Sequence, residues 1–179
     1  MSKNVLIISS SLRKNSNSQM LADSFMRGVE EAGHNAEKIS LDGKTINFCK
    51  GCFACLKTQK CLINDDGREI AEKMLNADVI VFATPVYYYS VSGQLKTMLD
   101  RANPLFCSDY KFRDIYLLAT AAENKKETVS GTVTAVKGWV DCFEKAALRK
   151  TIFAGGVNDA GDIKGHPALQ EAYETGKQL

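Results

Sequence analysis

The sequence predicts an α/β protein with a doubly wound, five-stranded parallel sheet in the order 2-1-3-4-5 and helices on both faces. Short apolar runs, typical of strands buried on both faces, recur at residues 4–9, 78–84 and 115–120. Segments with helical periodicity separate these runs, and such repeated β-α units favour a parallel sheet. The 179 residues suit one domain, 1–179, with a single core.

In the first half of the chain we expect strands at 4–9 and 36–41, helices from about 18 to 32 and from 66 to 76, and an irregular stretch at 42–64. The first helix carries one apolar stripe, formed by Leu21, Phe25, Val29 and Ala32, and Gly33 is expected to stop it. The second strand is polar and is expected at an edge. An irregular stretch as long as 42–64 is usually functional.

In the second half we expect strands at 78–84, 115–120 and 151–155, and helices at 92–103, 131–147 and 167–176. Pro85 is expected to end its strand. Ligands of such sheets bind at the carboxyl ends of the strands, where the strand order reverses. The loops after the first, third and fourth strands are therefore the expected binding segments.

Charge and composition exclude several classes of function. The net charge of +2 gives no basis for a nucleic-acid or membrane partner, and it disfavours a dedicated electron shuttle with a strongly charged docking surface. No targeting segment or membrane-spanning run is recognisable, which favours a cytoplasmic protein. Reduced thiols are expected there, so the six cysteines are not expected to form structural disulfides.

The loop after the first strand has the composition of a phosphate site. Hydroxyls of Ser9, Ser11, Ser16 and Ser18 supply donors, and Arg13 supplies a planar guanidinium, next to a helix N-terminus that favours anions. The chain lacks a G-x-G-x-x-G motif here, so a phosphomonoester is favoured over a dinucleotide pyrophosphate. The alternative is ordinary turn chemistry with a helix cap at Ser18.

The loop after the third strand contains three consecutive tyrosines, Tyr87 to Tyr89. Successive side chains cannot all point into a core, so a flat aromatic ligand stacked on one of them is a natural explanation. A subunit interface is the alternative, because tyrosine is enriched at interfaces. Small residues follow the fourth strand, and Thr120 and Ala121 there would allow close approach of a ligand to the backbone.

Four cysteines lie within thirteen residues, at Cys49, Cys52, Cys55 and Cys61. Four thiolates at this spacing suit a 4Fe–4S cluster or a tetrahedral zinc, and the two short gaps favour the cluster. A set of reduced cysteines without metal remains an equal alternative. Cys107 and Cys142 are expected to be packing residues, and His34 and His166 are expected at the surface.

Both binding loops resemble those of the NAD(P)H-dependent FMN reductases, a flavodoxin-like family. The matches are Ser11, Arg13 and 17–18 in the first loop, and the pattern P-x-Y-x-x-S-V-S-x-Q-L-K at 85–96, with D-R at 100–101. The resemblance implies FMN as cofactor, with NAD(P)H as the reductant and a quinone or other small molecule as the acceptor. The implied FMN contacts are Ser9, Ser11, Arg13, Asn17, Ser18, Pro85, Val86, Tyr87, Tyr88, Thr120 and Ala121. No protein acid or base is needed for hydride transfer to the flavin, so no catalytic residue is expected.

The cysteine spacing also resembles that of the iron–sulfur flavoproteins, a branch of the same family. That resemblance implies a 4Fe–4S cluster on Cys49, Cys52, Cys55 and Cys61, although similar spacing occurs in members without one. Relatives of this kind usually form homodimers or homotetramers. Two other functions remain as alternatives: a flavodoxin-like electron carrier without enzymatic activity, and a metal-binding sensor in which the cysteine loop is the functional part.

Overall fold

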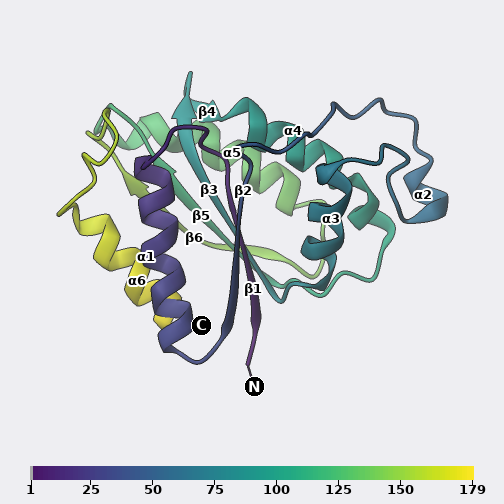
Figure 1. Ribbon diagram of the computed structural model, residues 1–179, viewed down its shortest axis with the longest axis horizontal. Helices are drawn as coiled ribbons and strands as arrows, with labels where there is room; N and C mark the ends of the chain where they lie inside the picture. Colours follow the sequence, from purple (N-terminus) through teal and green to yellow (C-terminus); the bar gives the residue numbers. More distant parts are fainter. Residues whose placement is uncertain (1) are drawn as a thin grey trace.

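A central sheet lies between two layers of helices in the computed structural model, which describes residues 2–179 (Figure 1). Five parallel strands run in the order β2-β1-β3-β5-β6, which confirms the predicted topology. Their bounds are β1 Asn4–Ser9, β2 Asn35–Ser40, β3 Val79–Tyr87, β5 Asp114–Thr120 and β6 Ala147–Ala154. A two-residue strand, β4 (Ser90–Val91), pairs antiparallel with the end of β3.

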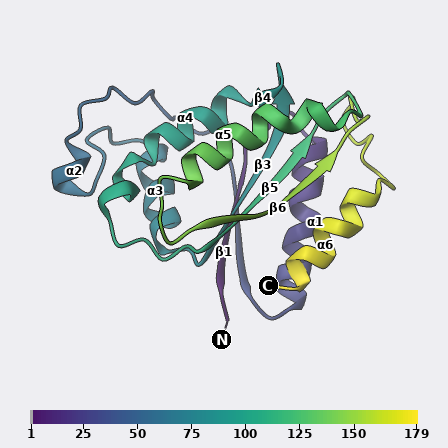
Figure 2. The ribbon, with the colours of Figure 1, turned by 180° about the vertical axis from the view of Figure 1, so that it is seen from behind.

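The helices divide between the two faces of the sheet (Figures 1 and 2). One face carries α1 (Asn17–Glu31) and α6 (Pro167–Lys177). The other face carries α3 (Asp66–Asn76), α4 (Gly93–Arg101) and α5 (Ser130–Val140). A short helix α2 (Cys55–Thr58) and two 3₁₀ turns, η1 (Asn103–Cys107) and η2 (Lys126–Val129), complete the described elements. None of the helices within residues 2–179 has the length and apolar character needed to cross a bilayer.

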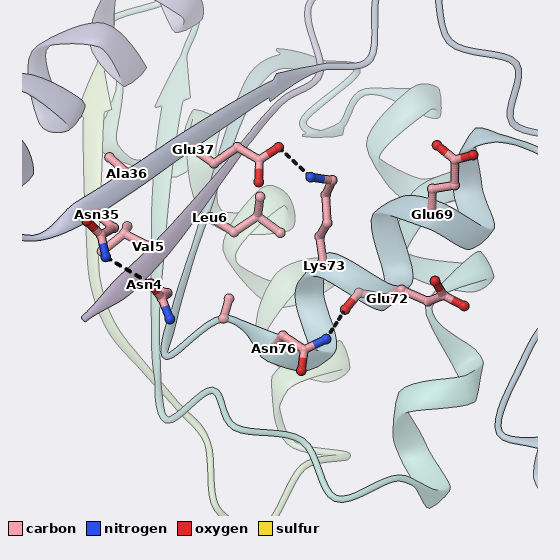
Figure 3. A pocket seen from close by; sticks show the side chains of 11 residues that line it. Asn4, Val5, Leu6, Asn35, Ala36, Glu37, Glu69, Glu72, Lys73 and Asn76 are labelled. Atoms are coloured by element: carbon pink, nitrogen blue, oxygen red, sulfur yellow. Dashed lines mark hydrogen bonds and ion pairs between the residues drawn. The ribbon is translucent and has the colours of Figure 1, made fainter. Parts of the chain in front are cut away.

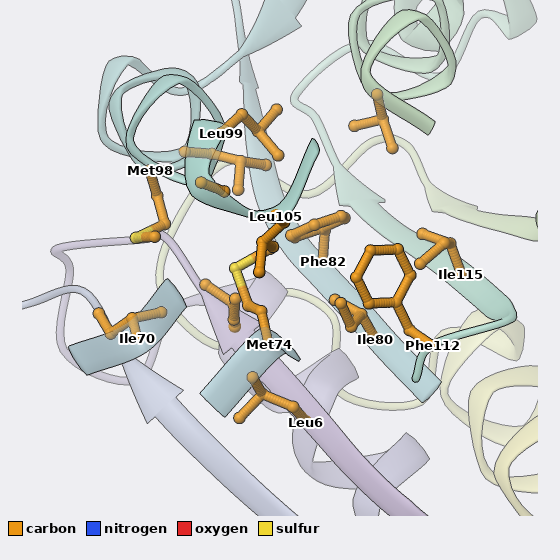
Figure 4. Close-up of a cluster of buried hydrophobic side chains, with 14 of the residues drawn as sticks. Leu6, Ile70, Met74, Ile80, Phe82, Met98, Leu99, Leu105, Phe112 and Ile115 are labelled. Carbon is orange, nitrogen blue, oxygen red and sulfur yellow. The ribbon is translucent and has the colours of Figure 1, made fainter. Parts of the chain in front are cut away.

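Alternating side chains of the strands form two separate cores, because successive residues of a strand point to opposite faces. Ile7 and Val81 pack under α1 and α6. Leu6, Ile80 and Phe82 belong to the larger core under α3, α4 and α5 (Figure 4). Both faces of the central strands are therefore buried, which explains their continuous apolar runs.

Two glycines allow α1 and α6 to pack in close contact. A Cβ on Gly28 would lie 2.0 Å from the Tyr173 carbonyl oxygen, and a Cβ on Gly176 would lie 2.2 Å from the Phe25 carbonyl oxygen. Any side chain at either position would push the two backbones apart. This contact fixes the position of α1, whose N-terminus follows the first binding loop.

Several predicted bounds are wrong for tertiary reasons. Strand β3 continues through Pro85 to Tyr87, because β1 already ends opposite Ala83 and the missing N–H of proline breaks no bond to it. Helix α5 ends at Val140 instead of 147, and β6 begins at Ala147 instead of 151, since the chain must turn there to pair with Asp114. Helix α4 ends at Arg101, and the rest of its predicted range enters η1.

Helix α1 shows two smaller differences from the prediction. The cap is Ser16 and not Ser18, and Ala32 at the other end is exposed, so the apolar stripe ends at Val29. Gly33, with a φ of +81°, follows the helix as expected.

Candidate functional site

The first binding loop joins β1 to α1 and presents a helix N-terminus. The Ser16 hydroxyl accepts a hydrogen bond from the Gln19 N–H at 3.2 Å, so it caps the helix. The Ser18 hydroxyl is buried in the first turn and has no hydrogen-bond partner among residues 2–179. A buried hydroxyl without a partner is costly, and an anion at this helix end would satisfy it.

The three predicted loops meet at the carboxyl edge of the sheet around a cavity of about 200 Å³. All the predicted FMN contacts line it except Ser9 and Tyr88. The lining residues are Ser11, Arg13, Ser16, Asn17, Ser18, Pro85, Val86, Tyr87, Thr120, Ala121, Ala122, Val157, Asn158 and Ala160. The polar donors come from the first loop, and the small and apolar side chains come from the other loops. The arrangement suits a ligand with an anionic end and a flat apolar part.

Ser9 and Tyr88 lie outside this cavity. Ser9 is the last residue of β1, where it is buried between Ser40 of β2 and Ala83 of β3. Tyr88 is fully exposed at the tip of the hairpin between β3 and β4. The prediction for Tyr88 did not include β4, which pairs with the end of β3 and places Tyr88 in the turn between the two strands.

A fourth loop, after β6, was missing from the sequence prediction. The Arg13 guanidinium donates to the Asn158 carbonyl at 3.0 Å. The Asn17 side chain donates to the Asp159 carbonyl at 2.9 Å and accepts from the Gly161 and Ile163 N–H groups at 3.1 and 3.2 Å. Asn17 therefore anchors this loop, and its amide is already occupied. The signal available in the sequence was the position of the loop after the last strand of a parallel sheet.

The tyrosine segment forms a two-residue hairpin turn with Tyr88 and Tyr89 at its centre, at φ values of +48° and +61°. Such a turn favours Asn and Gly, and tyrosine there stores local strain. The Tyr89 hydroxyl donates to the Glu123 carboxylate at 3.2 Å, and this hydrogen bond to Glu123 raises the pKa of Tyr89. The Tyr89 carbonyl packs onto Gly131, where a Cβ would lie 2.1 Å away. The turn is thus fixed against the end of β5 and the start of α5.

The four predicted cysteines line a second cavity, of about 410 Å³, together with Cys142, Trp139 and Phe143. Cys55 is buried, Cys61 is half-buried, and Cys49 and Cys52 are exposed. Positive φ angles at Gly51 and Phe53 turn the chain between the cysteines. No three of their sulfurs are gathered as a ligand group within residues 2–179. Four thiols are nevertheless the donor set that a tetrahedral centre uses.

Cys107 and Cys142 differ from the prediction that both are packing residues. Cys142 is exposed on α5's C-terminal side and lines the same cavity as the four-cysteine run. Cys107 is half-buried, and its thiol contacts the Cys55 carbonyl at 3.4 Å. His166 caps α6 through Nδ1, which accepts from the Ala168 N–H at 3.1 Å.

A buried ion pair connects the cysteine loop to α4. Arg101, which is 1% exposed, forms two hydrogen bonds with Asp65, at 2.7 and 2.8 Å. The Arg101 guanidinium holds the pKa of Asp65 well below its usual range. Gln94, Lys96 and Asp100 lie on the same helix, and the Lys96–Asp100 ion pair at its surface stabilises that helix.

A further cavity, of about 580 Å³, lies between β1, β2 and α3, on the side of the larger core (Figure 3). Its polar groups are largely paired with one another: Lys73 bonds Glu37 at 2.7 Å, and Asn35 bonds Asn4 at 3.3 Å. None of the predicted site residues lies there. The carboxyl edge of the sheet therefore remains the candidate site for chemistry.

A parallel sheet in the order β2-β1-β3-β5-β6 with helices on both faces defines a flavodoxin-like fold. Solved structures agree on this fold: an NAD(P)H:quinone oxidoreductase from Methanothermobacter marburgensis has a TM-score of 0.78 at 19% identity, covering 100% of this chain and 96% of that one. An azoreductase from Bacillus anthracis has a TM-score of 0.70 at 19% identity and covers 100% of both chains.

The family model described as NADPH-dependent FMN reductase matches residues 3–154. The chain belongs to this family and is a flavin oxidoreductase. An iron–sulfur flavoprotein of Archaeoglobus fulgidus is 36% identical over 171 residues, covering 91% of this chain and 77% of the relative. One of Methanocaldococcus jannaschii is 43% identical over 101 residues, covering 56% of this chain and 52% of the relative, so that match spans about half of each.

Proposed function

We propose that the chain is an FMN-dependent NAD(P)H oxidoreductase that passes electrons, through a 4Fe–4S cluster on the cysteine loop, to a quinone or other small acceptor. One observation carries the proposal: four cysteines at iron–sulfur spacing line one cavity in a chain whose curated relatives, at 36% to 43% identity, are iron–sulfur flavoproteins. The family supplies the flavin chemistry, and the cysteines distinguish this chain from a simple FMN reductase.

The first loop has the groups to bind the FMN phosphate. The unpartnered Ser18 hydroxyl and the N-terminus of α1 offer donors to an anion, and Arg13 adds a positive charge at the rim of the cavity. Arg13 is held by the Asn158 carbonyl, so the guanidinium is positioned before a ligand arrives. The loss of one hydrogen bond to a charged phosphate would cost about 1.5–3 kcal/mol of binding free energy.

The remaining loops suit the ring of the flavin. Pro85 and Val86 present apolar surface, while Ala121 and Ala122 after β5 add only small side chains to the wall of the cavity. FMN, when bound, supplies the hydride-accepting and electron-releasing chemistry. The protein's part is to orient the ring and leave one face open to the nicotinamide. No side chain of the cavity is required to move a proton in the hydride step.

The cysteine loop has the groups to hold the cluster. Cys49, Cys52, Cys55 and Cys61 would be the ligands, and an iron–sulfur cluster there would let electrons leave one at a time. Trp139 and Phe143 wall the inner side of this cavity and limit access of water. A second candidate is an FMN reductase without a cluster, and it is favoured by the separation of the cysteine sulfurs within residues 2–179.

We also propose a homodimer or homotetramer and a cytoplasmic location. Exposed aromatic side chains surround the cysteine loop and the hairpin tip, and an interface would cover them: Phe48, Phe53, Tyr88 and Phe106. The six cysteines are unpaired, as in a reducing compartment. Size-exclusion chromatography with light scattering measures the oligomeric state.

The test of this proposal is anaerobic purification followed by absorption spectroscopy and by flavin, iron and sulfide analysis. One FMN and about four irons per chain, with nicotinamide-dependent reduction of both chromophores, are expected. Cys52→Ser should lose iron and keep flavin. Cys142→Ser is the matched control, because Cys142 lines the same cavity outside the four-cysteine run, and it should keep both.

Three results of this test would contradict different parts of the proposal: the presence of a cluster, the identity of the metal, or the binding of flavin. Flavin without iron in the wild-type protein would leave the FMN reductase without a cluster. Zinc in place of iron would leave the metal-binding alternative. Absence of flavin, even after FMN is added, would overturn the proposed function itself.

A further inference from the structure

One side chain, Arg101, connects the two ends of the segment that carries the four cysteines. The Arg101 guanidinium donates to the Asn47 carbonyl at 2.7 Å and to the Ile63 carbonyl at 3.1 Å. Asn47 precedes the first cysteine and Ile63 follows the last. Asp65 holds the same guanidinium from the other side and also accepts from the Asn47 N–H at 2.9 Å. The two ends of the segment that carries all four cysteines are therefore held together by α4.

Residues at the end of α4 and the start of η1 also lie close to two of the cysteines. The Asn103 side-chain amide donates to the Cys55 sulfur at 3.0 Å. Arg101 lines the cavity that it shares with Cys61, and its Nε–H is buried without a partner among residues 2–179. The hydrogen bonds to Asp65 are the main cause of the raised pKa of Arg101.

We propose that Arg101 and Asn103 are positioning residues for the cysteine site, Asn103 through an N–H donor to the Cys55 sulfur and Arg101 through a buried positive charge in the cavity that Cys61 lines, and that both raise the reduction potential of the cluster held there. This inference rests on the proposed function, because it needs the cluster. The two residues lie outside the four-cysteine segment, Arg101 on α4 and Asn103 on η1.

The direction of the effect follows from charge. Reduction adds one electron and one negative charge to a thiolate-ligated cluster, and no bond is formed or broken. Hydrogen-bond donors and a fixed positive charge stabilise the more negative, reduced state, so they raise the reduction potential. Arg101 is 1% exposed and Cys55 is buried, so water screens these interactions weakly. Removing either donor should make the potential more negative.

Asn103→Leu is the sharpest variant, because it keeps the size of the side chain and removes only the donor to the sulfur. Cys107→Ala is the matched control: Cys107 lies on the same 3₁₀ turn, and its thiol contacts the Cys55 backbone carbonyl at 3.4 Å and not the Cys55 sulfur. The measurement is a redox titration of the anaerobically purified holoprotein followed by electron paramagnetic resonance, with iron and flavin content determined on the same samples.

We expect Asn103→Leu to retain iron and FMN and to have a more negative cluster potential, while Cys107→Ala keeps the wild-type potential. Arg101→Lys, which keeps the charge but cannot bond both carbonyls and Asp65 at once, should lose iron faster on exposure to a chelator. The flavin potential should be unchanged in every variant, since the two cavities share no lining residue.

The outcomes separate the inference from the proposed function. If the wild type binds iron and Asn103→Leu has the wild-type potential, the inference is wrong and the function stands. The same conclusion follows if Cys107→Ala shifts the potential as far as Asn103→Leu, because the effect is then general packing. If the wild type binds FMN but no iron, the cluster proposal fails and this inference fails with it.

Discussion

Two cavities of this protein are built in opposite ways: the one at the carboxyl edge of the sheet, where we propose that FMN binds (the flavin cavity), and the one that the four cysteines line (the cysteine cavity). The flavin cavity lies where four strand ends meet, and its walls are fixed by the sheet and by the glycine contact of α1 with α6. The cysteine cavity is bounded by an irregular segment that regular hydrogen bonding hardly supports, and one buried ion pair closes it. A site on regular elements depends on many weak contacts, whereas a site on a long loop depends on a few strong ones.

The largest expected effect is the loss of stability when the ion pair beside the cysteine cavity is removed. Asp65→Asn should destabilise the protein by about 3–5 kcal/mol, because it leaves the buried Arg101 charge without its counter-ion. Urea denaturation measures the free energy of unfolding. Asp100→Asn is the matched control: this neighbouring carboxylate pairs with Lys96 at the surface, so its loss should cost less than about 1 kcal/mol. Equal effects of the two variants would show that Asp65 is not the anchor of the loop.

The next largest expected effect is on the affinity of the flavin cavity for FMN. Ser18→Ala should weaken FMN binding by about 1.5–3 kcal/mol, or roughly ten- to a hundredfold in Kd, and should not reduce the stability of the flavin-free protein, because the hydroxyl has no internal partner. Fluorescence titration with FMN measures Kd. Thr132→Val removes another buried unpartnered hydroxyl, on α5, and should leave Kd unchanged. An unchanged Kd in Ser18→Ala would remove Ser18 from the phosphate site.

Gly176→Ala tests how far the flavin cavity depends on helix packing. The added Cβ would meet the Phe25 carbonyl at 2.2 Å, so we expect a loss of about 1–3 kcal/mol in stability and weaker FMN binding, with iron content unchanged. Thermal denaturation and FMN titration measure the two effects. Gly138→Ala, in open space on α5, should be neutral or stabilising by up to about 1 kcal/mol. Loss of iron in Gly176→Ala would show that the two sites are mechanically coupled.

The smallest effect is the pH dependence that the ion pair creates. The folded-state pKa of Asp65 lies below its unfolded value of 3.8, so folding favours the ionised form. The resulting stabilisation is complete above about pH 5 and is lost as the pH falls through the unfolded value toward the folded one. Denaturation curves between pH 3 and pH 6 should show the wild type losing stability faster than Asp65→Asn as the pH falls. Parallel curves would contradict this assignment.

Much of this protein follows from its sequence alone, for a physical reason. Buried strands such as 4–9 need apolar residues on both faces, and that requirement is local enough to appear as a continuous run. The parallel topology then places the segments 11–18, 85–87 and 120–121 at one edge of the sheet, so most of the flavin cavity could be predicted from the order of the elements. The cysteine spacing was likewise visible without a structure.

Only the tertiary structure decided the rest, because it depends on residues far apart in the chain. Asn17 was predicted to bind phosphate, yet its amide holds the loop after β6, more than 140 residues away. Arg101 was recognised only as part of a family motif, and it holds together the two ends of the cysteine loop through a bond to Asn47, 54 residues away. Sequence patterns report which face of an element is buried. They do not report which partner a polar side chain meets, and in this protein those partners define both sites.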